Sequence, residues 1–319
     1  LGKKVKVGII GSGMVGATSA YAIMLRKAAS DIVLIDANEK RAIAEAQDIM
    51  HAVPFAAATD IYAGSYDDIK DAKVVIIAAG ANQKPGETRL MLMEKNAAIM
   101  RDIISKTASV NPDVIFLVAT NPVDIITHIC TSIAEEFGIP ASRIIGSGTT
   151  LDTARFRSLL GAHVGVDPQH VHAYVLGEHG DSEVLAWSNI DIGGVPLEDF
   201  IAYRNIEFNE EIKNKTDDGV RNAAYKIIEG KGSTYYGVAG AIAKLVEVIN
   251  RDNRAVLTVS LLKDDVEGVK DVTLSLPHLI GGEGDLGVLP IKLSVKEKQL
   301  LRKSAEIIKK KIDEYEHSK

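Results

Sequence analysis

The sequence has few of the features that mark secreted or membrane-spanning proteins. Cys130 is the single cysteine of the chain, so no internal disulfide can form, which suits a reducing cytoplasm. No uninterrupted apolar run approaches the roughly 20 residues of a transmembrane helix. The first residues, LGKKVK, run straight into VGIIGSG, whose glycines interrupt the apolar region that a signal peptide needs. We therefore expect a cytoplasmic protein that does not contact a membrane.

The sequence also lacks an excess of positive charge. It has 37 lysines and arginines against 43 aspartates and glutamates, a formal net charge of −6. Proteins that bind nucleic acids are usually basic, so no nucleic-acid partner is expected. The lysine-rich segment 292–319 is the basic candidate, but acids are interspersed in it. Its apolar residues have helical spacing, which predicts an amphipathic C-terminal helix that docks on the body through Leu301, Ala305, Ile308, Ile312 and Tyr315.

The first half of the chain has the pattern of an α/β fold. With 319 residues, of which 46% are hydrophobic, the chain is long enough for two domains or one large unit. Short β-branched runs alternate with helix-period segments, which predicts parallel strands joined by helices that begin near Gly13, Lys40, Glu87 and Asn121. The strands are expected at 5–10, 31–36, 74–79, 114–120 and 143–146. We therefore predict a Rossmann doubly wound parallel sheet over residues 1–145.

The second half, residues 146–319, has a different pattern. The segments 171–176 and around Gly193-Gly194 indicate antiparallel strands, and helical periodicity runs over 209–229 and 234–250. This combination predicts an α+β domain that would carry the substrate-binding and catalytic residues. Asn121-Pro122 is a typical helix start, with asparagine as the cap and proline at the first helical position.

A glycine motif after the first predicted strand indicates a dinucleotide site. In GSGMVG, Gly11 allows a sharp turn, Gly13 allows a pyrophosphate to approach the backbone, and Gly16 allows the helix to pack on the strand. Met14 and Val15, between the last two glycines, belong to the expected cofactor contacts. Asp36 follows the last glycine by 20 residues, at the end of the second strand, where it would accept the ribose hydroxyl hydrogens and repel a 2′-phosphate. The predicted cofactor is NAD, and no metal is expected.

Nicotinamide chemistry also requires a group that exchanges a proton with the substrate oxygen, and histidine suits this because its pKa is near neutrality. Spacing does not choose among the eight histidines at 51, 128, 163, 170, 172, 179, 278 and 317. His179 is the favoured one, because it lies on a glycine-flanked turn in LGEHGD after an apolar strand. Asp152 would orient it, and Arg155 would bind a substrate carboxylate, although an acid at a helix start and an exposed arginine are also ordinary structural features. The segment 82–89 would form a lid that carries Arg89.

These motifs resemble the lactate and malate dehydrogenase family over essentially the whole chain. GSGMVG, AGANQKPGETR, VATNPVD, GSGTTLDTARFR, GEHGD and KGST occur in the family's order. The resemblance implies that His179 is the proton donor and acceptor, Asp152 its orienting carboxylate, Arg155 the carboxylate clamp and Arg89 the lid arginine. It further implies that Asn121 lies beside substrate and nicotinamide, that Thr234 lines the substrate pocket, and that Val238 lies under the nicotinamide ring.

Gln83 bears on which substrate is used. In the malate enzymes the matching lid residue is an arginine that pairs with the second carboxylate of oxaloacetate. A neutral glutamine favours the methyl group of pyruvate, because a buried dicarboxylate would keep an unpaired charge. The expected reaction interconverts pyruvate and L-lactate as the last step of fermentative glycolysis. A malate or other 2-hydroxyacid dehydrogenase is the alternative, and a non-catalytic NAD-binding protein is a third possibility that has no need of His179, Asp152, Arg155 and Arg89 together.

The resemblance also implies a homotetramer and a regulatory site. Arg157 and His172 match the basic pair with which many bacterial members bind fructose 1,6-bisphosphate across a subunit interface. Two symmetry-related pairs would supply positive charge for two phosphates. An ordinary surface or interface role for both residues remains open.

Overall fold

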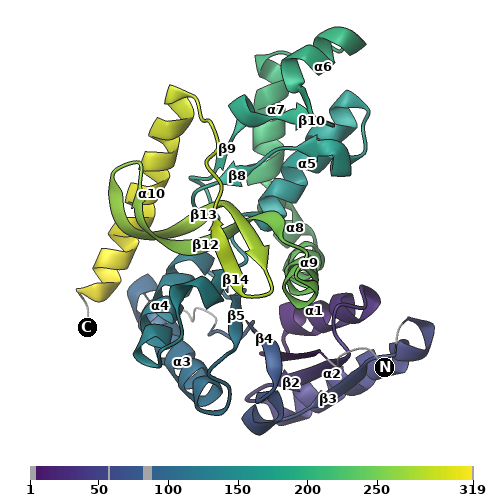
Figure 1. Cartoon of the computed structure of the whole chain (residues 1–319), viewed down its shortest axis with the longest axis vertical. Coiled ribbons are helices and arrows are strands. Elements are labelled where there is room, and N and C mark those ends of the chain that lie inside the picture. Colours follow the sequence, from purple (N-terminus) through teal and green to yellow (C-terminus); the bar gives the residue numbers. More distant parts are fainter. Residues whose placement is uncertain (1–4, 57, 82–87, 318–319) are drawn as a thin grey trace.

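The structure is a computed structural model that describes residues 5–56, 58–81 and 88–317. It confirms the predicted α/β fold, with a large, mostly parallel sheet in the first half and an α+β second half. In Figure 1 the strands β1 to β3 lie at the lower end of the molecule, and α5 to α7 lie at the upper end. The first half contains β1 (Lys6–Ile10), α1 (Met14–Leu25), β2 (Asp31–Ile35), α2 (Glu39–Ala52), β3 (Asp60–Ala63), β4 (Ala72–Ile77), α3 (Arg89–Val110), β5 (Ile115–Val118), α4 (Val123–Glu136) and β6 (Ile144–Gly146).

The second half is built from shorter strands and longer helices. It contains α5 (Thr150–Val164), β7 (Val171–His172), β8 (Val175–Leu176), β9 (Val184–Leu185), β10 (Asp191–Ile192), β11 (Val195–Pro196), α6 (Leu197–Arg204), α7 (Glu210–Arg221), α8 (Ala223–Lys231), α9 (Tyr236–Arg251), β12 (Ala255–Val266), β13 (Val269–Gly281), β14 (Gly284–Val288) and α10 (Val295–Glu316). Short 3-10 turns lie at Val53–Phe55, Tyr66–Ile69, Ala141–Arg143, Pro168–His170 and Trp187–Asn189.

One sheet runs through both halves in the order β14-β13-β12-β6-β5-β4-β1-β2-β3. The strands from β3 to β6 are parallel, and β12 pairs antiparallel with β6 at Ser260 and Gly146. The central strands are buried on both faces, as their uninterrupted apolar sequences predict. Their order 3-2-1-4-5-6 is that of a Rossmann fold, whose ligands bind outside the carboxyl ends of the strands.

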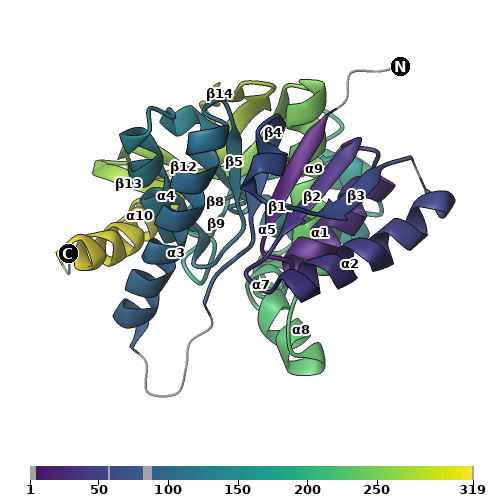
Figure 2. The same ribbon diagram turned by 90° about the horizontal axis from the view of Figure 1, so that it is seen from below.

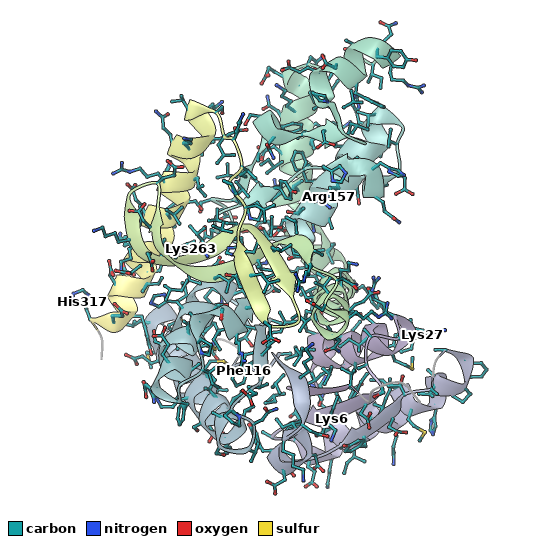
Figure 3. The ribbon with its side chains drawn as sticks, in the orientation of Figure 1. Lys6, Lys27, Phe116, Arg157, Lys263 and His317 are labelled. Carbon is teal, nitrogen blue, oxygen red and sulfur yellow. The ribbon has the colours of Figure 1, made fainter. Side chains whose placement is uncertain are left out.

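Helices cover the two faces of this sheet. One apolar core joins the sheet to α3, α4 and α10, and another joins it to α1, α2 and α9. Figure 2 shows α3 and α4 beside β5, with α1 and α2 along β1 to β3. Phe116 in β5 is fully buried near the centre of the sheet (Figure 3). Each such fully buried large side chain contributes about 1.5–3 kcal/mol. The C-terminal helix docks as predicted, since Leu301, Ala305, Ile308, Ile312 and Tyr315 are all buried.

The five strands predicted for the first half are confirmed within three residues at their ends, but β3 was not predicted. It is a short edge strand with only one buried residue, Ile61, so it lacks the apolar run of its neighbours. The predicted cap and start of α4 are each wrong by one residue. Pro122 has the extended backbone of a cap (ψ 115°), so the helix begins at Val123, and the Asn121 side chain accepts the Val123 N–H at 3.2 Å.

The second half departs further from the predicted pattern. The segment 171–176 is divided between β7 and β8, which belong to different small sheets, and 209–229 is divided into α7 and α8 at Asn222. The antiparallel turn at Gly193-Gly194 is confirmed, since it joins β10 to β11. The hairpin of β12 and β13, which extends the first-half sheet, was not predicted. Polar residues interrupt its alternation, and its Glu267-Gly268 turn lacks the asparagine or aspartate that marks such turns in a sequence.

Candidate active site

The carboxyl ends of the parallel strands bring the predicted motifs to one edge of the sheet. The glycine turn follows β1, Asn121 follows β5, and α5 with Asp152 follows β6. The Thr120 hydroxyl after β5 donates to the Ala79 carbonyl after β4 at 2.6 Å, and the Ser147 N–H after β6 donates to the Val118 carbonyl of β5 at 2.9 Å. Hydrogen bonds therefore join the ends of β4, β5 and β6 at the edge where a Rossmann fold binds its ligand.

The glycine turn is tightly packed at Gly11 and Gly16 and open at Gly13. Gly11 has a φ of +102°, and a Cβ there would lie 2.5 Å from the Ala79 nitrogen. A Cβ on Gly16 would lie 1.8 Å from the Gly11 carbonyl oxygen, so α1 packs directly on the turn. A Cβ on Gly13 would meet nothing within 4 Å. Open space thus adjoins the start of α1, where backbone N–H groups and the helix dipole attract anions.

Asp36 is held beside this turn. Its Oδ2 accepts the Ser12 N–H at 2.6 Å and its Oδ1 accepts the Asn38 N–H at 2.8 Å. The Ser12 hydroxyl is buried and has no hydrogen-bond partner among the described residues. A glycine cradle, a helix N-terminus and an acid at the end of β2 fit the diphosphate and ribose of a dinucleotide. Met14 and Val15 open α1 at this place.

The structure brings His179 and Asp152 together. The imidazole Nδ1 lies 2.6 Å from Asp152 Oδ2, and Asp152 Oδ1 accepts a hydrogen bond of 2.7 Å from Arg155 Nη1. Asp152 is in the first turn of α5, and Arg155 follows three residues later, on the same face of the helix. Asp152 is 2% exposed, whereas 27% of the His179 side chain remains exposed. One carboxylate therefore orients both the imidazole and the guanidinium from the protein side.

Buried charges around His179 favour its protonated form. Burial alone would lower the imidazole pKa, but the hydrogen bond and negative charge of Asp152 raise it, and the His179 pKa lies at about 9. Burial alone would raise the Asp152 pKa, but the His179 hydrogen bond and positive charge keep it below its ordinary value. The pair is thus an imidazolium and a carboxylate at neutral pH.

Two further acids near His179 were not predicted from the sequence. Asp124 is 3% exposed, and its Oδ2 accepts the His179 backbone N–H at 2.8 Å. Glu183 is 4% exposed, its Oε1 has no hydrogen-bond partner among the described residues, and burial followed by the charge of Asp152 raises its pKa to about 8. Both belong to quoted motifs or their continuation, VATNPVD and GEHGDSE, but the sequence does not show that they converge on one histidine.

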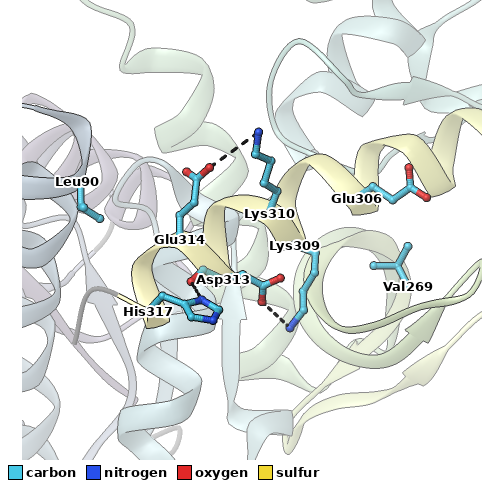
Figure 4. A pocket seen from close by; sticks show the side chains of 8 residues that line it. All are labelled: Leu90, Val269, Glu306, Lys309, Lys310, Asp313, Glu314 and His317. Carbon is cyan, nitrogen blue, oxygen red and sulfur yellow. Dashed lines mark hydrogen bonds and ion pairs between the residues drawn. The ribbon is translucent and has the colours of Figure 1, made fainter.

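A cavity of about 610 Å³ adjoins the turn that carries His179. The turn residues Glu178 and Gly180 to Glu183 line it on one side, and α7, α8 and α10 close it on the others. Another hollow, of about 700 Å³, lies along α10 (Figure 4). Lys309 pairs there with Asp313 at 3.1 Å. The described residues His179, Asp152 and Arg155 line neither hollow, so neither cavity by itself identifies the substrate site.

The remaining predicted site residues have these positions. Asn121 is exposed after β5, Thr234 is half-buried between α8 and α9, and Val238 is half-buried in the first turn of α9. Gln83 lies outside the described residues, as does the side chain of Arg89. Among the described residues, no hydrogen bond or ion pair joins Asn121, Thr234 or Val238 to His179.

Of the predicted regulatory pair, Arg157 lies on α5 (Figure 3) and is partly buried. Its Nε donates to the Ala173 carbonyl at 3.0 Å, and its guanidinium lies 5.5 Å from the Tyr174 ring. His172 is exposed on β7 and precedes Ala173 directly. The two residues are thus neighbours in space.

The described residues contain neither a metal-binding cluster nor a membrane-spanning helix. No group of three or more histidine, cysteine, aspartate or glutamate side chains is arranged to hold a metal ion in this part of the chain. Within the same residues, no helix has both the length and the apolar character required to cross a bilayer.

Comparison with known families decides the identity. Residues 5–146 match the lactate/malate dehydrogenase NAD binding domain, and residues 149–319 match the lactate/malate dehydrogenase alpha/beta C-terminal domain. The chain belongs to the lactate/malate dehydrogenase family. This match confirms the resemblance found in the sequence, and it confirms NAD as the cofactor of this dehydrogenase.

Relatives of this dehydrogenase cover nearly its whole length. It is 53% identical to an L-lactate dehydrogenase of Geotalea daltonii, over 97% of this chain and 98% of that one. It is 49% identical to an L-lactate dehydrogenase of Thermus aquaticus, over 95% of this chain and 97% of that one. Among solved structures, the ligands-bound minor L-lactate dehydrogenase of Enterococcus mundtii has a TM-score of 0.92 and 38% identity, over 97% of this chain and 98% of that one.

Proposed function

We propose that this dehydrogenase reduces pyruvate to L-lactate with NADH and a proton, and catalyses the reverse oxidation with NAD. Its enzyme class is NAD-dependent L-lactate dehydrogenase. L-lactate dehydrogenases that are 49–53% identical to it over nearly the full chain indicate this class. The observation that carries the proposal is the buried Asp152 carboxylate, which contacts both the His179 imidazole and the Arg155 guanidinium. A proton donor and an anion-binding group are thereby fixed side by side, as reduction of a 2-oxo acid requires.

The roles follow from this geometry. Bound NADH supplies the hydride to the keto carbon of the substrate. Arg155 uses one nitrogen for Asp152, and its remaining N–H groups bind the substrate carboxylate as a charged, two-pronged pair. His179 donates the proton on Nε2 to the keto oxygen, while Asp152 holds the Nδ1–H and stabilises the imidazolium before transfer. Arg89, the residue that begins α3, polarises the ketone from the lid.

Substrate choice depends on Gln83. A glutamine offers no positive charge to a second carboxylate, so a dicarboxylic 2-oxo acid would be bound with an unpaired charge. Initial rates of NADH oxidation with pyruvate and with oxaloacetate separate the two family activities. We expect kcat/KM for pyruvate to exceed that for oxaloacetate by at least about tenfold, which corresponds to 1.4 kcal/mol. A preference for oxaloacetate would favour the malate dehydrogenase alternative.

His179→Asn tests the proton donor directly. Asparagine cannot transfer a proton at neutral pH, so kcat for pyruvate reduction should fall by about 10²–10⁴-fold, the usual contribution of general acid catalysis. NADH binding, measured by the change in nicotinamide fluorescence, should stay within about twofold, because the predicted dinucleotide contacts lie on the glycine turn. A variant that keeps a normal rate would contradict the role of His179.

The regulatory prediction is proposed on similar grounds. Arg157 donates to the carbonyl of Ala173, the residue that follows His172. A second subunit related by twofold symmetry would bring a second such pair opposite them. We propose a homotetramer in which fructose 1,6-bisphosphate bridges these pairs and activates the enzyme. Measured with and without the bisphosphate, KM for pyruvate should fall and the sedimentation coefficient should rise. An Arg157→Gln, His172→Gln double variant should lose both responses. No response in the unsubstituted enzyme would refute this regulation.

The cell context is proposed from the reaction and the composition. With its single cysteine, this enzyme suits the reducing cytoplasm, where it would complete fermentative glycolysis and regenerate NAD.

A further inference from the structure

We propose that Asp124, together with Ser260, is a positioning residue that fixes the main chain of His179 during catalysis. This inference rests on the proposed role of His179 as the proton donor. Asp152 holds the imidazole by one ring nitrogen, and Asp124 holds the same residue by its backbone N–H, at 2.6 and 2.8 Å respectively. The histidine is thus anchored at two points by two different helices, α5 and α4.

The hydrogen bond to Nδ1 fixes the imidazole but does not fix the backbone of residue 179. The two residues before it are held, since Gly177 pairs with Ser275 and the Glu178 N–H donates to the Ser304 hydroxyl at 2.9 Å. The Asp124 carboxylate extends this support to the His179 N–H, and its loss would let residue 179 shift and displace Nε2 from the substrate. Misplacement of reacting groups by as little as about 1 Å reduces rates by about 10²-fold. Loss of the hydrogen bond between Asp124 and the His179 N–H should therefore lower kcat.

Asp124 is itself rigidly held. It lies in the first turn of α4, and its Oδ1 accepts the Ser260 hydroxyl at 2.6 Å. Ser260 is fully buried in β12, at the point where β12 pairs with β6. The Asp124 carboxylate therefore links α4, β12 and the turn that carries His179 (residues 177–183), which we call the catalytic turn. Each of its oxygens has an assigned donor, which is the arrangement expected of a fixed second support.

The ionic form of Asp124 is unfavourable for the fold. Burial raises its pKa to about 6, even though the Ser260 and His179 hydrogen bonds oppose this shift. A neutral asparagine would meet the hydrogen-bonding needs of the His179 N–H without an ionised group. The Asp124 carboxylate has a second effect besides accepting the His179 backbone N–H. Its negative charge also stabilises the imidazolium form of His179.

Several charged groups affect the titration of His179 and Asp124. Asp152, Asp124 and Glu183 act on His179, and Glu178 acts on Asp124. These acids are in turn affected by further groups, namely Asp152 by Arg155 on α5, Glu183 by Asp217 and Arg221 on α7, and Glu178 by Lys311 on α10. The test therefore compares variants that remove only the charge of Asp124 with variants that remove its hydrogen bonds.

Three variants of the full chain separate the two contributions. Asp124→Asn keeps an oxygen for the His179 N–H but removes the charge, Asp124→Ala removes both, and Ser260→Ala releases the carboxylate from β12. Ser132→Ala is the matched control, because it removes a hydroxyl from the same helix α4 that donates only to the His128 carbonyl. Pyruvate reduction is measured from pH 6 to pH 10, together with NADH affinity and the melting temperature.

We expect kcat to fall by about 10²-fold in Asp124→Ala, with NADH affinity unchanged. Asp124→Asn should recover at least a third of the kcat of the unsubstituted enzyme, while the alkaline limb of its kcat/KM profile moves to lower pH. Ser260→Ala should fall between these two, and Ser132→Ala should match the unsubstituted enzyme. At pH 8 the melting temperature of Asp124→Asn should not decrease, because this variant no longer buries an ionised carboxyl.

An Asp124→Ala or Ser260→Ala protein whose kcat stays within threefold of the unsubstituted enzyme would overturn the positioning role. An Asp124→Asn protein with an unshifted pH profile would overturn the contribution of the Asp124 charge. If Asp124→Ala does not fold, Ser260→Ala decides the positioning role. Failure of the proposed function is distinguishable, because it would leave the unsubstituted enzyme without pyruvate reduction.

Discussion

At the scale of single residues, the proposed role of His179 predicts that its protonation state sets which direction of the reaction the enzyme can catalyse. Reduction consumes the imidazolium, and its pKa is raised to about 9, so kcat/KM for pyruvate should be constant at lower pH and fall tenfold per pH unit above that value. Oxidation of lactate needs the neutral imidazole, so kcat/KM for lactate should rise with pH over the same range. Rate measurements at saturating cofactor test both limbs. Limbs that both lie near pH 6.5 would show that Asp152 does not perturb His179.

Asp152→Asn is the companion substitution. It preserves shape but removes the charge that does most to raise the His179 pKa, so the alkaline limb of pyruvate reduction should move toward the ordinary histidine value of about 6.5. The rate constant should fall as well, because an amide can hold the wrong tautomer of the imidazole. An unchanged profile in this variant would contradict the assignment of Asp152.

The sequence alone does not single out His179 among the histidines. A second pair exists in the structure, since His278 Nδ1 lies 2.8 Å from Asp285, but that ring is fully buried and lies on β13. The resemblance to a known family made the choice, and the geometry now gives a physical reason for it. Asp124 and Glu183 were not predicted, because a sequence does not distinguish a buried acid from one that caps a helix or faces solvent.

At the scale of elements, the turn between β1 and α1 offers a matched pair of glycine substitutions. Gly13→Ala places its Cβ in open space, so the melting temperature of the protein without cofactor should change little, while the methyl group should obstruct the diphosphate and weaken NADH binding at least about tenfold. Gly16→Ala places its Cβ 1.8 Å from the Gly11 oxygen, so α1 must move and the melting temperature should fall. Titration calorimetry and thermal unfolding measure the two effects. Normal NADH affinity in Gly13→Ala would contradict the predicted diphosphate position.

Elements were predictable where one local signal dominates. The first-half strands are apolar runs between turn residues, and α10 has apolar residues at regular helical spacing along one face. Both were therefore predicted from the sequence. The hairpin of β12 and β13 depends on pairing with β6, a contact between residues about 110 positions apart, and its half-polar strands carry no comparable local signal. The break between α7 and α8 at Asn222 was missed because its two flanks share one helical periodicity.

At the scale of the whole molecule, the sheet does not end at the predicted boundary near residue 145. It continues through β6 into β12, and α1 and α9 share one apolar core, so the two halves of the sequence are joined by backbone hydrogen bonds as well as by side chains. The division into 1–145 and 146–319 stays a prediction. What the continuous sheet does provide is a rigid support under the catalytic turn, since Gly177 pairs with Ser275 of β13 through two hydrogen bonds of 2.9 Å.

The buried charges of the site also give the molecule a pH-dependent stability. The Glu183 pKa is raised to about 8 in the folded chain, so the folded state binds that proton more tightly than the unfolded state, and the stabilisation is lost as the pH rises through 8. His179, raised to about 9, contributes stability that is complete below its unfolded pKa of about 6.5 and disappears as the pH rises through 9. Both contributions have the same sign. The melting temperature of the cofactor-free enzyme should therefore decrease between pH 6.5 and 9.

Glu183→Gln separates the two groups. The variant keeps the shape of the side chain but cannot ionise, so its melting temperature should fall less between pH 6.5 and 8, and the fall that remains should follow the titration of His179. Lys6→Gln serves as the control, because it removes a charged group whose partner Asp71 is exposed at the surface, and it should leave the pH dependence unchanged over this interval. A Glu183→Gln curve parallel to that of the unsubstituted enzyme would mean that Glu183 is already ionised at pH 6.5. In that case three negative charges would surround the imidazole throughout the working range of the enzyme, and the proton of His179 would be held still more tightly.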